Sequence, residues 1–228
     1  MVAAKPLRLH EEVMLLALRD VKGTVATGFL DVAIAGAVLA ELLLERRIAV
    51  DSTRKQLVDL LDTRPAGDPV IDVCIERMRA AKKRASLQAW VSRLAGIRNL
   101  RQLVALRLCH RGVLRADEDK VLLIFRRRIY PELNPLPERK IIERLRTAIF
   151  ADDRQLDPRT VALISLASSA GMLNEVFGRK ELKARRKRIE QIVNGELAGK
   201  ATKDVIAACQ AAAAVAVMVT TTAAAASH

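Results

Sequence analysis

The segment from Phe29 to Leu44 is almost wholly apolar, and it constrains the fold of this chain more than any other stretch. It is about 16 residues long, which is short of the ~20 residues that an α-helix needs to cross a bilayer. It also contains two carboxylates, Asp31 and Glu41. We therefore predict a helix in the centre of a protein core rather than a membrane span. Gly36 and the alanines beside it would let other elements approach this helix closely.

The rest of the chain favours a helical fold around that core. The 228 residues, of which 51% are apolar, suffice for one large domain or two small ones. Asp68 and Asp157 each precede a proline, a pairing typical of a helix start. Short strands are expected only within residues 47–60 and 113–130. The predicted fold class is therefore mainly α, a single globular multi-helix domain with short β-hairpins, with about ten helices and two hairpins.

The charge of the chain points to an anionic partner. Lys and Arg number 39 against 26 Asp and Glu, which gives a net charge of +13. Such an excess suits a phospholipid surface, a nucleic acid or an acidic protein. Aromatic residues make up only 3% of the chain, which weakens any interpretation based on stacking of single-stranded bases.

The cysteines and the N-terminal sequence indicate an intracellular protein. Cys74, Cys109 and Cys209 are odd in number and far apart, as is typical of reduced thiols rather than of a disulfide framework. The first residues, MVAAKPLRLHEEV, lack the apolar core of a secretory signal, so we expect no signal peptide.

No sequence pattern argues for catalysis. The three histidines, His10, His110 and His228, have no cysteine or histidine neighbours at zinc-binding spacing. The chain contains no phosphate-binding loop, dinucleotide fingerprint or serine-nucleophile elbow. Glu11 and Glu12 are adjacent and are interpreted as charges at a helix start. We therefore expect no catalytic residue, no metal site and no cofactor.

Residues 97–130 form the strongest candidate for a functional surface. Their first half predicts a basic helix that carries Arg98, Arg101 and two further arginines and ends at Gly112. Residues 116–119 have the composition of a turn, and an apolar strand with a cationic end follows them. That strand and its cationic end comprise Val121, Leu122, Leu123, Ile124, Phe125, Arg126, Arg127 and Arg128.

This segment allows several interpretations. Apolar residues beside arginine clusters suit a surface that is both anionic and apolar, such as a layer of phospholipid headgroups. A strand packed in the core next to a solvated run of charges fits the same spacing. A basic helix followed by a hairpin also describes a winged-helix module, which makes a nucleic-acid-binding protein the alternative function.

Five blocks of the sequence, in this order, are LHEEVMLLALRDVKG, AGAVLAELLLERRIAVD, LLDTRPAGDPVIDVCIERM, IRNLRQLVALRLCHRGVL and LDPRTVALISLASSAGMLNEVFG. Together they resemble the Golgi phosphoprotein 3 family, and the resemblance covers roughly residues 7–219. The family consists of peripheral membrane proteins that bind phosphatidylinositol 4-phosphate, and bacterial relatives exist. The resemblance implies one mainly α-helical domain over residues 7–219 of a bacterial-type member. From their composition, we expect residues 220–228 to form a disordered tail.

The resemblance also implies a headgroup site. Arg98 and Arg101 match the Arg-x-x-Arg pair of the family pocket, and one helical turn apart both could reach one phosphate. The apolar hairpin of the family, which enters membranes and supports self-association, matches residues 120–130. The pocket Trp and Arg of the family fall near Ala26 and Ala35, and neither residue type is present here.

The expected function is therefore that of a cytoplasmic protein attached reversibly to anionic membranes. A basic pocket and an apolar hairpin would recognise phosphatidylinositol 4-phosphate or a similar phospholipid, and the protein would serve as a trafficking or sorting adaptor. The expected partners are an anionic phospholipid membrane and further copies of the chain, bound through the hairpin. The sequence does not identify a protein cargo.

Overall fold

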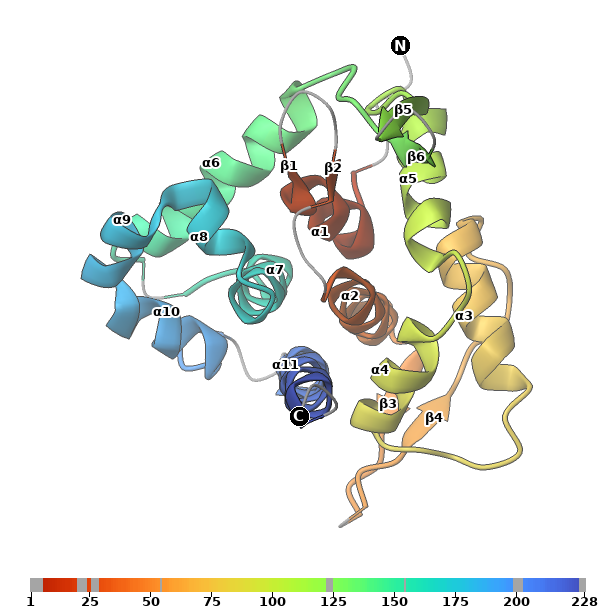
Figure 1. Ribbon diagram of the computed structural model, residues 1–228. Coiled ribbons are helices and arrows are strands. Elements are labelled where there is room, and N and C mark those ends of the chain that lie inside the picture. The colour runs from red at the N-terminus through yellow and green to blue at the C-terminus, as the bar shows by residue number, and fades with distance from the viewer. Residues whose placement is uncertain are drawn as a thin grey trace.

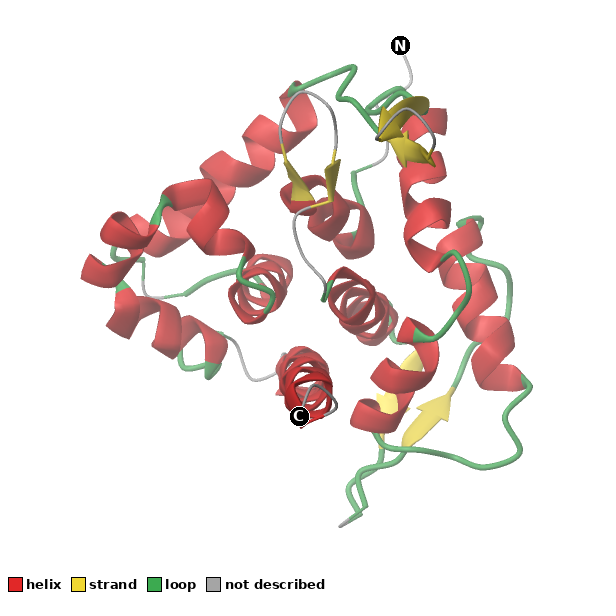
Figure 2. Cartoon of the chain, in the orientation of Figure 1, coloured by secondary structure: helices red, strands yellow, loops and turns green. Residues whose placement is uncertain are grey.

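The chain folds into a helical domain with a few short strands (Figures 1 and 2). The computed structural model describes residues 6–19, 24–25, 29–53, 55–121, 125–153, 155–198 and 203–225. The helices are α1 (Leu9–Ala17), α2 (Leu30–Leu44), α3 (Pro69–Arg79), α4 (Leu87–Ala95), α5 (Leu100–His110), α6 (Leu136–Phe150), α7 (Pro158–Ser169), α8 (Met172–Phe177), α9 (Arg179–Ala184), α10 (Arg186–Val193) and α11 (Lys203–Ala225). The mainly α fold class predicted from the sequence is confirmed.

Three two-stranded antiparallel sheets accompany the helices in the described residues, one more than the sequence predicts. They pair β1 (Leu18–Arg19) with β2 (Thr24–Val25), β3 (Ile48–Val50) with β4 (Val58–Leu60), and β5 (Asp117–Val121) with β6 (Phe125–Ile129). The β1–β2 sheet is the one that was not predicted. With two residues in each strand, it is too short to produce an alternating apolar pattern.

Helix α2 lies in the centre of the domain, with α1, α4, α7 and α11 around it (Figure 1). Most of its residues are buried, as expected of a helix that is apolar on every side. The prediction of a central core helix is therefore confirmed. Across the described part of the chain, no helix combines the length and apolar character that crossing a membrane requires.

Gly36 permits a close contact of α2 with two neighbouring helices. A Cβ atom placed on it would lie 2.6 Å from the Cβ of Ala212 in α11 and 2.9 Å from Cδ2 of Leu166 in α7. Carbon atoms do not approach so closely, so α2 can meet these two helices at this distance only with glycine at position 36. The predicted role of Gly36 is confirmed.

We expect Gly36→Ala to lower the free energy of unfolding by up to about 2 kcal/mol. Overpacking a core typically costs 1–3 kcal/mol, and the higher helix propensity of alanine offsets about 1 kcal/mol of that. Chemical denaturation measures the change. Gly96→Ala is the matched control, because its new Cβ would meet no atom nearer than 3.6 Å. Equal stability of the two variants would show that the bundle adjusts to the added methyl group.

Helix starts and ends follow the local sequence where capping groups are present. The Asp68 carboxylate accepts hydrogen bonds from the N–H groups of Val70 and Ile71, and Asp157 caps α7 in the same way. At the end of α5, Gly112 has φ +70°, and the N–H of Val113 donates to Leu108 O at 3.0 Å. This is a left-handed C-terminal cap of the predicted kind.

The basic segment at residues 179–193 forms two short helices, α9 and α10, which meet at Arg185. The guanidinium group of Arg185 donates to Phe150 O at 2.7 Å, a distant contact that no local pattern indicates. The backbone of α11 continues to Ala225, into the segment predicted to be a tail, as the high helix propensity of alanine allows.

The strands of the β5–β6 hairpin begin and end at other residues than the sequence predicts. Strand β5 begins at Asp117, so the predicted turn at residues 116–119 is wrong. Glu118 pairs with Arg128 across the two strands. Opposite charges facing each other stabilise a strand pair, which accounts for acidic residues in a strand. Val121 pairs with Phe125 at the end of the ladder, and residues 122–124 of the predicted apolar run fall outside the described part of the chain.

Candidate functional site

The candidate site lies at the N-terminal end of α5. Arg98 is exposed in the turn after α4, and Asn99 follows it with a left-handed backbone at φ +62°. The helix therefore begins at Leu100, three residues later than expected, and only Arg101 lies in its first turn. The predicted pair is thus brought to one helix end, with one arginine before the helix and one inside it.

The electrostatics of this helix end favour an anion. Asn99 makes no side-chain capping hydrogen bond, and the first turn of α5 contains no acidic residue. The first N–H groups of a helix have no intrahelical partner, and the helix dipole places a partial positive charge there. Two arginines add to that charge. Such an end can bind a phosphate group through backbone N–H groups and guanidinium groups together.

Asp31 is the counter-ion of this site. It lies in the first turn of α2, and its Oδ1 is 2.8 Å from Nε of Arg101. Burial raises the pKa of Asp31 above its usual value, although the nearby Arg101 guanidinium lowers it. A phosphate group must compete with this carboxylate for Arg101. The sequence indicated Asp31 only as a charge unsuited to a membrane span, and its partnership with Arg101 was missed.

The other two arginines of the predicted basic helix face the protein interior. Nη1 of Arg111 is 2.8 Å from Oε2 of Glu11, which is completely buried. Nε of Arg107 is 3.5 Å from Oδ2 of Asp68, which is also buried. Helix α5 is therefore not a uniformly cationic surface. Within it, Arg101 is the arginine that stays half-exposed, at 46%.

These inward contacts belong to a buried network of charges around α1. Glu41 at the end of α2 binds both terminal nitrogens of Arg159, at 2.7 and 3.0 Å. Glu12 accepts a hydrogen bond from Arg144 at 2.9 Å. Burial raises the pKa of Glu12, and Arg144 opposes that rise. Glu11 and Glu12 do lie in the first turn of α1, as predicted, but their burial was not predicted.

The hairpin lies at the opposite end of α5 from the arginine pair (Figure 1). The N–H of Arg115 donates to Pro131 O at 2.9 Å, which closes the base of the hairpin just after the helix ends. Eleven helical residues span about 16 Å. Both features therefore flank one helix, but they form two separate contact points and not one site.

The second helix supplies no further polar group at the positions expected from the family pocket. Ala35 is completely buried within α2. Ala26 lies outside the described residues. Arg98, Arg101 and the start of α5 therefore carry the candidate site.

Fold and site together define a mainly helical protein with an uncapped, cationic helix start and a hairpin at the far end of the same helix. The family model of Golgi phosphoprotein 3 (GPP34) matches residues 9–209. Because this match covers most of the chain, the protein belongs to the Golgi phosphoprotein 3 family. The resemblance noted from the sequence blocks is confirmed.

Proposed function

We propose that this protein is a peripheral membrane protein that recognises anionic phospholipid headgroups at Arg98 and Arg101. The observation that supports this most is the uncapped, cationic N-terminus of α5. Membership of the Golgi phosphoprotein 3 family is consistent with a lipid-binding or trafficking role. The proposed ligand is phosphatidylinositol 4-phosphate or a similar phospholipid.

Attachment to a membrane would use both ends of α5. One weak anionic contact seldom holds a protein on a bilayer, and two signals are usually needed. With the axis of α5 parallel to the bilayer, the arginine pair would meet headgroups at one end while the apolar run of the hairpin meets the acyl boundary at the other. The two ends of α5 are about 16 Å apart, so a flat membrane surface can contact both.

The proposed cellular role follows from this attachment. The protein would act on the cytoplasmic side of a membrane as a trafficking or sorting adaptor without enzymatic activity. Self-association through the hairpin would join several weak membrane contacts and raise their combined affinity.

Nucleic-acid binding is the alternative function, and the burial of α5 disfavours it. A recognition helix must be exposed to enter a groove, whereas Val104, Ala105 and Leu108 of α5 are buried. Vesicle flotation beside duplex DNA binding, both at physiological salt, separates the two functions. We expect flotation with anionic vesicles and weak DNA binding. Strong duplex binding without flotation would replace the membrane proposal.

We expect Asp31→Asn to strengthen binding to anionic vesicles about fivefold. The change removes the competitor of the phosphate and one negative charge, and a charge near an anionic surface contributes about 1 kcal/mol. For the parent protein, binding should strengthen as the pH falls towards the raised pKa of Asp31, because protonation releases Arg101. The variant should lack that part of the pH dependence.

Vesicle titrations at two pH values test this expectation. Asp153→Asn is the matched control, because it removes an exposed carboxylate outside the α5 site. Equal strengthening in both variants would mean that net charge, and not the release of Arg101, controls binding.

We expect Leu123→Ser to weaken vesicle binding about fivefold with little change in its salt dependence. Burying a leucine completely contributes about 1.5–3 kcal/mol, and we expect only part of this because alternate side chains of a strand point to opposite faces. Leu61→Ser provides the control, because Leu61 is an exposed leucine at the end of β4. Thermal unfolding is measured in parallel. A large loss of stability in the Leu123 variant would place the apolar run in the core.

A further inference from the structure

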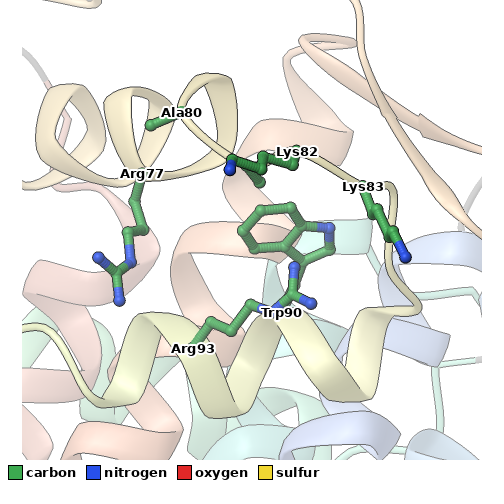
Figure 3. A pocket seen from close by; sticks show the side chains of 7 residues that line it. Arg77, Ala80, Lys82, Lys83, Trp90 and Arg93 are labelled. Atoms are coloured by element: carbon green, nitrogen blue, oxygen red, sulfur yellow. The ribbon is translucent and has the colours of Figure 1, made fainter.

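A second cationic pocket lies between α3 and α4, and none of its residues belongs to the Arg98–Arg101 site. Its volume is about 410 Å³. That volume is at the lower end of the range typical of small-ligand sites. Arg77 lines it from α3, Lys82 and Lys83 from the following loop, and Trp90 and Arg93 from α4 (Figure 3).

The four cations of this pocket have no carboxylate partner in the described part of the chain. Neighbouring cations in the same stretch do: Arg79 pairs with Glu76 at 2.8 Å, and Arg84 pairs with Asp51 at 2.7 Å. The carboxylates Glu76 and Asp51 thus pair with neighbouring cations and not with the four that line the pocket. All four are exposed, so the pocket is accessible from solvent. Their mutual repulsion would be relieved by a bound anion.

Trp90 supplies an additional donor. It is only 3% exposed, and its buried Nε1 has no hydrogen-bond acceptor among the described residues. Figure 3 shows the indole between the loop and α4, with its nitrogen on the side of Lys83. Buried donors without an acceptor are costly, and an oxygen of a ligand would satisfy this one. The Arg93 guanidinium lies 4.9 Å from the ring centroid, a stacking that holds it beside the pocket.

From this geometry we infer that the pocket is a binding site for a phosphorylated ligand, one that carries a phosphomonoester group. Such a group has a charge between −1 and −2 and three acceptor oxygens, which suits several converging cations and an N–H donor. A carboxylate has one charge and two oxygens, and would leave most of these donors unused. The ligand can come from a soluble phosphorylated compound or from the headgroup of a lipid, since both present the same chemistry.

The tryptophan of this pocket gives a direct readout. The chain contains one tryptophan, so tryptophan fluorescence reports on Trp90 alone. The full-length protein is titrated with inorganic pyrophosphate, and separately with phosphatidylcholine vesicles containing phosphatidylinositol 4-phosphate. Sodium chloride at matched ionic strength controls for screening. We expect a saturable change in emission with at least one of the two phosphorylated probes. A response to pyrophosphate alone identifies a soluble source, and a response to vesicles alone identifies a lipid headgroup.

Variants distinguish this pocket from the α5 site. Lys82→Ala with Lys83→Ala should weaken the response at least tenfold, and both side chains are exposed, so the fold should persist. Lys180→Ala with Lys183→Ala removes the same charge from α9 and should leave the response unchanged.

Arg98→Ala with Arg101→Ala separates the two proposals. The double arginine variant should weaken vesicle binding about 30-fold without changing the pyrophosphate response. The inference is overturned if no probe gives a saturable change, if the α9 control weakens the response equally, or if the double arginine variant removes it. None of these outcomes depends on whether the α5 site binds lipid.

Discussion

Replacing Arg159 by alanine should lower the free energy of unfolding by about 3 kcal/mol. Arg159 holds both carboxylate oxygens of Glu41, at 2.7 and 3.0 Å, and Glu41 is almost completely buried. Without the guanidinium group, the buried Glu41 carboxylate keeps only a longer ion pair with Arg8, whose Nη1 lies 3.7 Å from Oε1. Removing one partner of a buried pair costs about 3–5 kcal/mol, and the lower end applies because the Arg159 side chain is 31% exposed.

The contact also connects three helices. Arg159 belongs to α7, Glu41 to the end of α2, and the N–H of Leu9 at the start of α1 donates to the same carboxylate at 2.8 Å. We therefore expect the Arg159 variant to lose its stability in one cooperative unfolding transition. Arg186→Ala is the matched control, because its pair with Glu190 is exposed and should contribute less than about 0.5 kcal/mol. Similar losses in the two variants would mean that the buried pair contributes no more than a surface pair.

Arg98→Ala with Arg101→Ala should weaken binding to anionic vesicles about 30-fold. Each arginine near an anionic surface contributes about 1 kcal/mol, and a loss of about 2 kcal/mol corresponds to that factor. Removal of Arg101 also leaves the Asp31 carboxylate without its cation, which lies 2.8 Å away in the parent protein. This carboxylate would then repel the anionic surface and weaken binding further.

Equilibrium binding at several salt concentrations measures this effect. The difference between parent and variant should shrink at high salt, since the Debye length falls from about 8 Å at physiological ionic strength to about 3 Å at 1 M. Lys180→Ala with Lys183→Ala controls for net charge. If the control loses as much affinity as the arginine variant, general charge attraction rather than the α5 site governs attachment.

Local signals in the sequence were sufficient to predict the helical framework. The all-round apolar character of residues 29–44 placed α2 in the core, and Asp68 and Gly112 marked a helix start and a helix end. Each of these features depends only on residues that lie within one or two helical turns of it in the sequence. Pattern reasoning works at that range because caps and periodicity are local properties.

Contacts between distant segments could not be predicted in this way. Glu41 and Arg159 are 118 positions apart, and nothing near either residue indicates the other. Arg101 likewise meets Asp31 only because α2 and α5 pack together. The charged residues of α1 are buried because cations from other helices reach them, so their sequence resembles that of an exposed helix start. The arginine pair was found through the family resemblance, and its counter-ion was not.

Flotation of the unmodified protein tests the membrane proposal most directly. One set of vesicles contains phosphatidylcholine alone, and the other contains phosphatidylcholine with phosphatidylinositol 4-phosphate, at the same lipid concentration and physiological salt. We predict that the protein floats with the second set and stays in the lower fraction with the first. Equal flotation with both sets, or flotation with neither, would contradict recognition of an anionic headgroup at the start of α5.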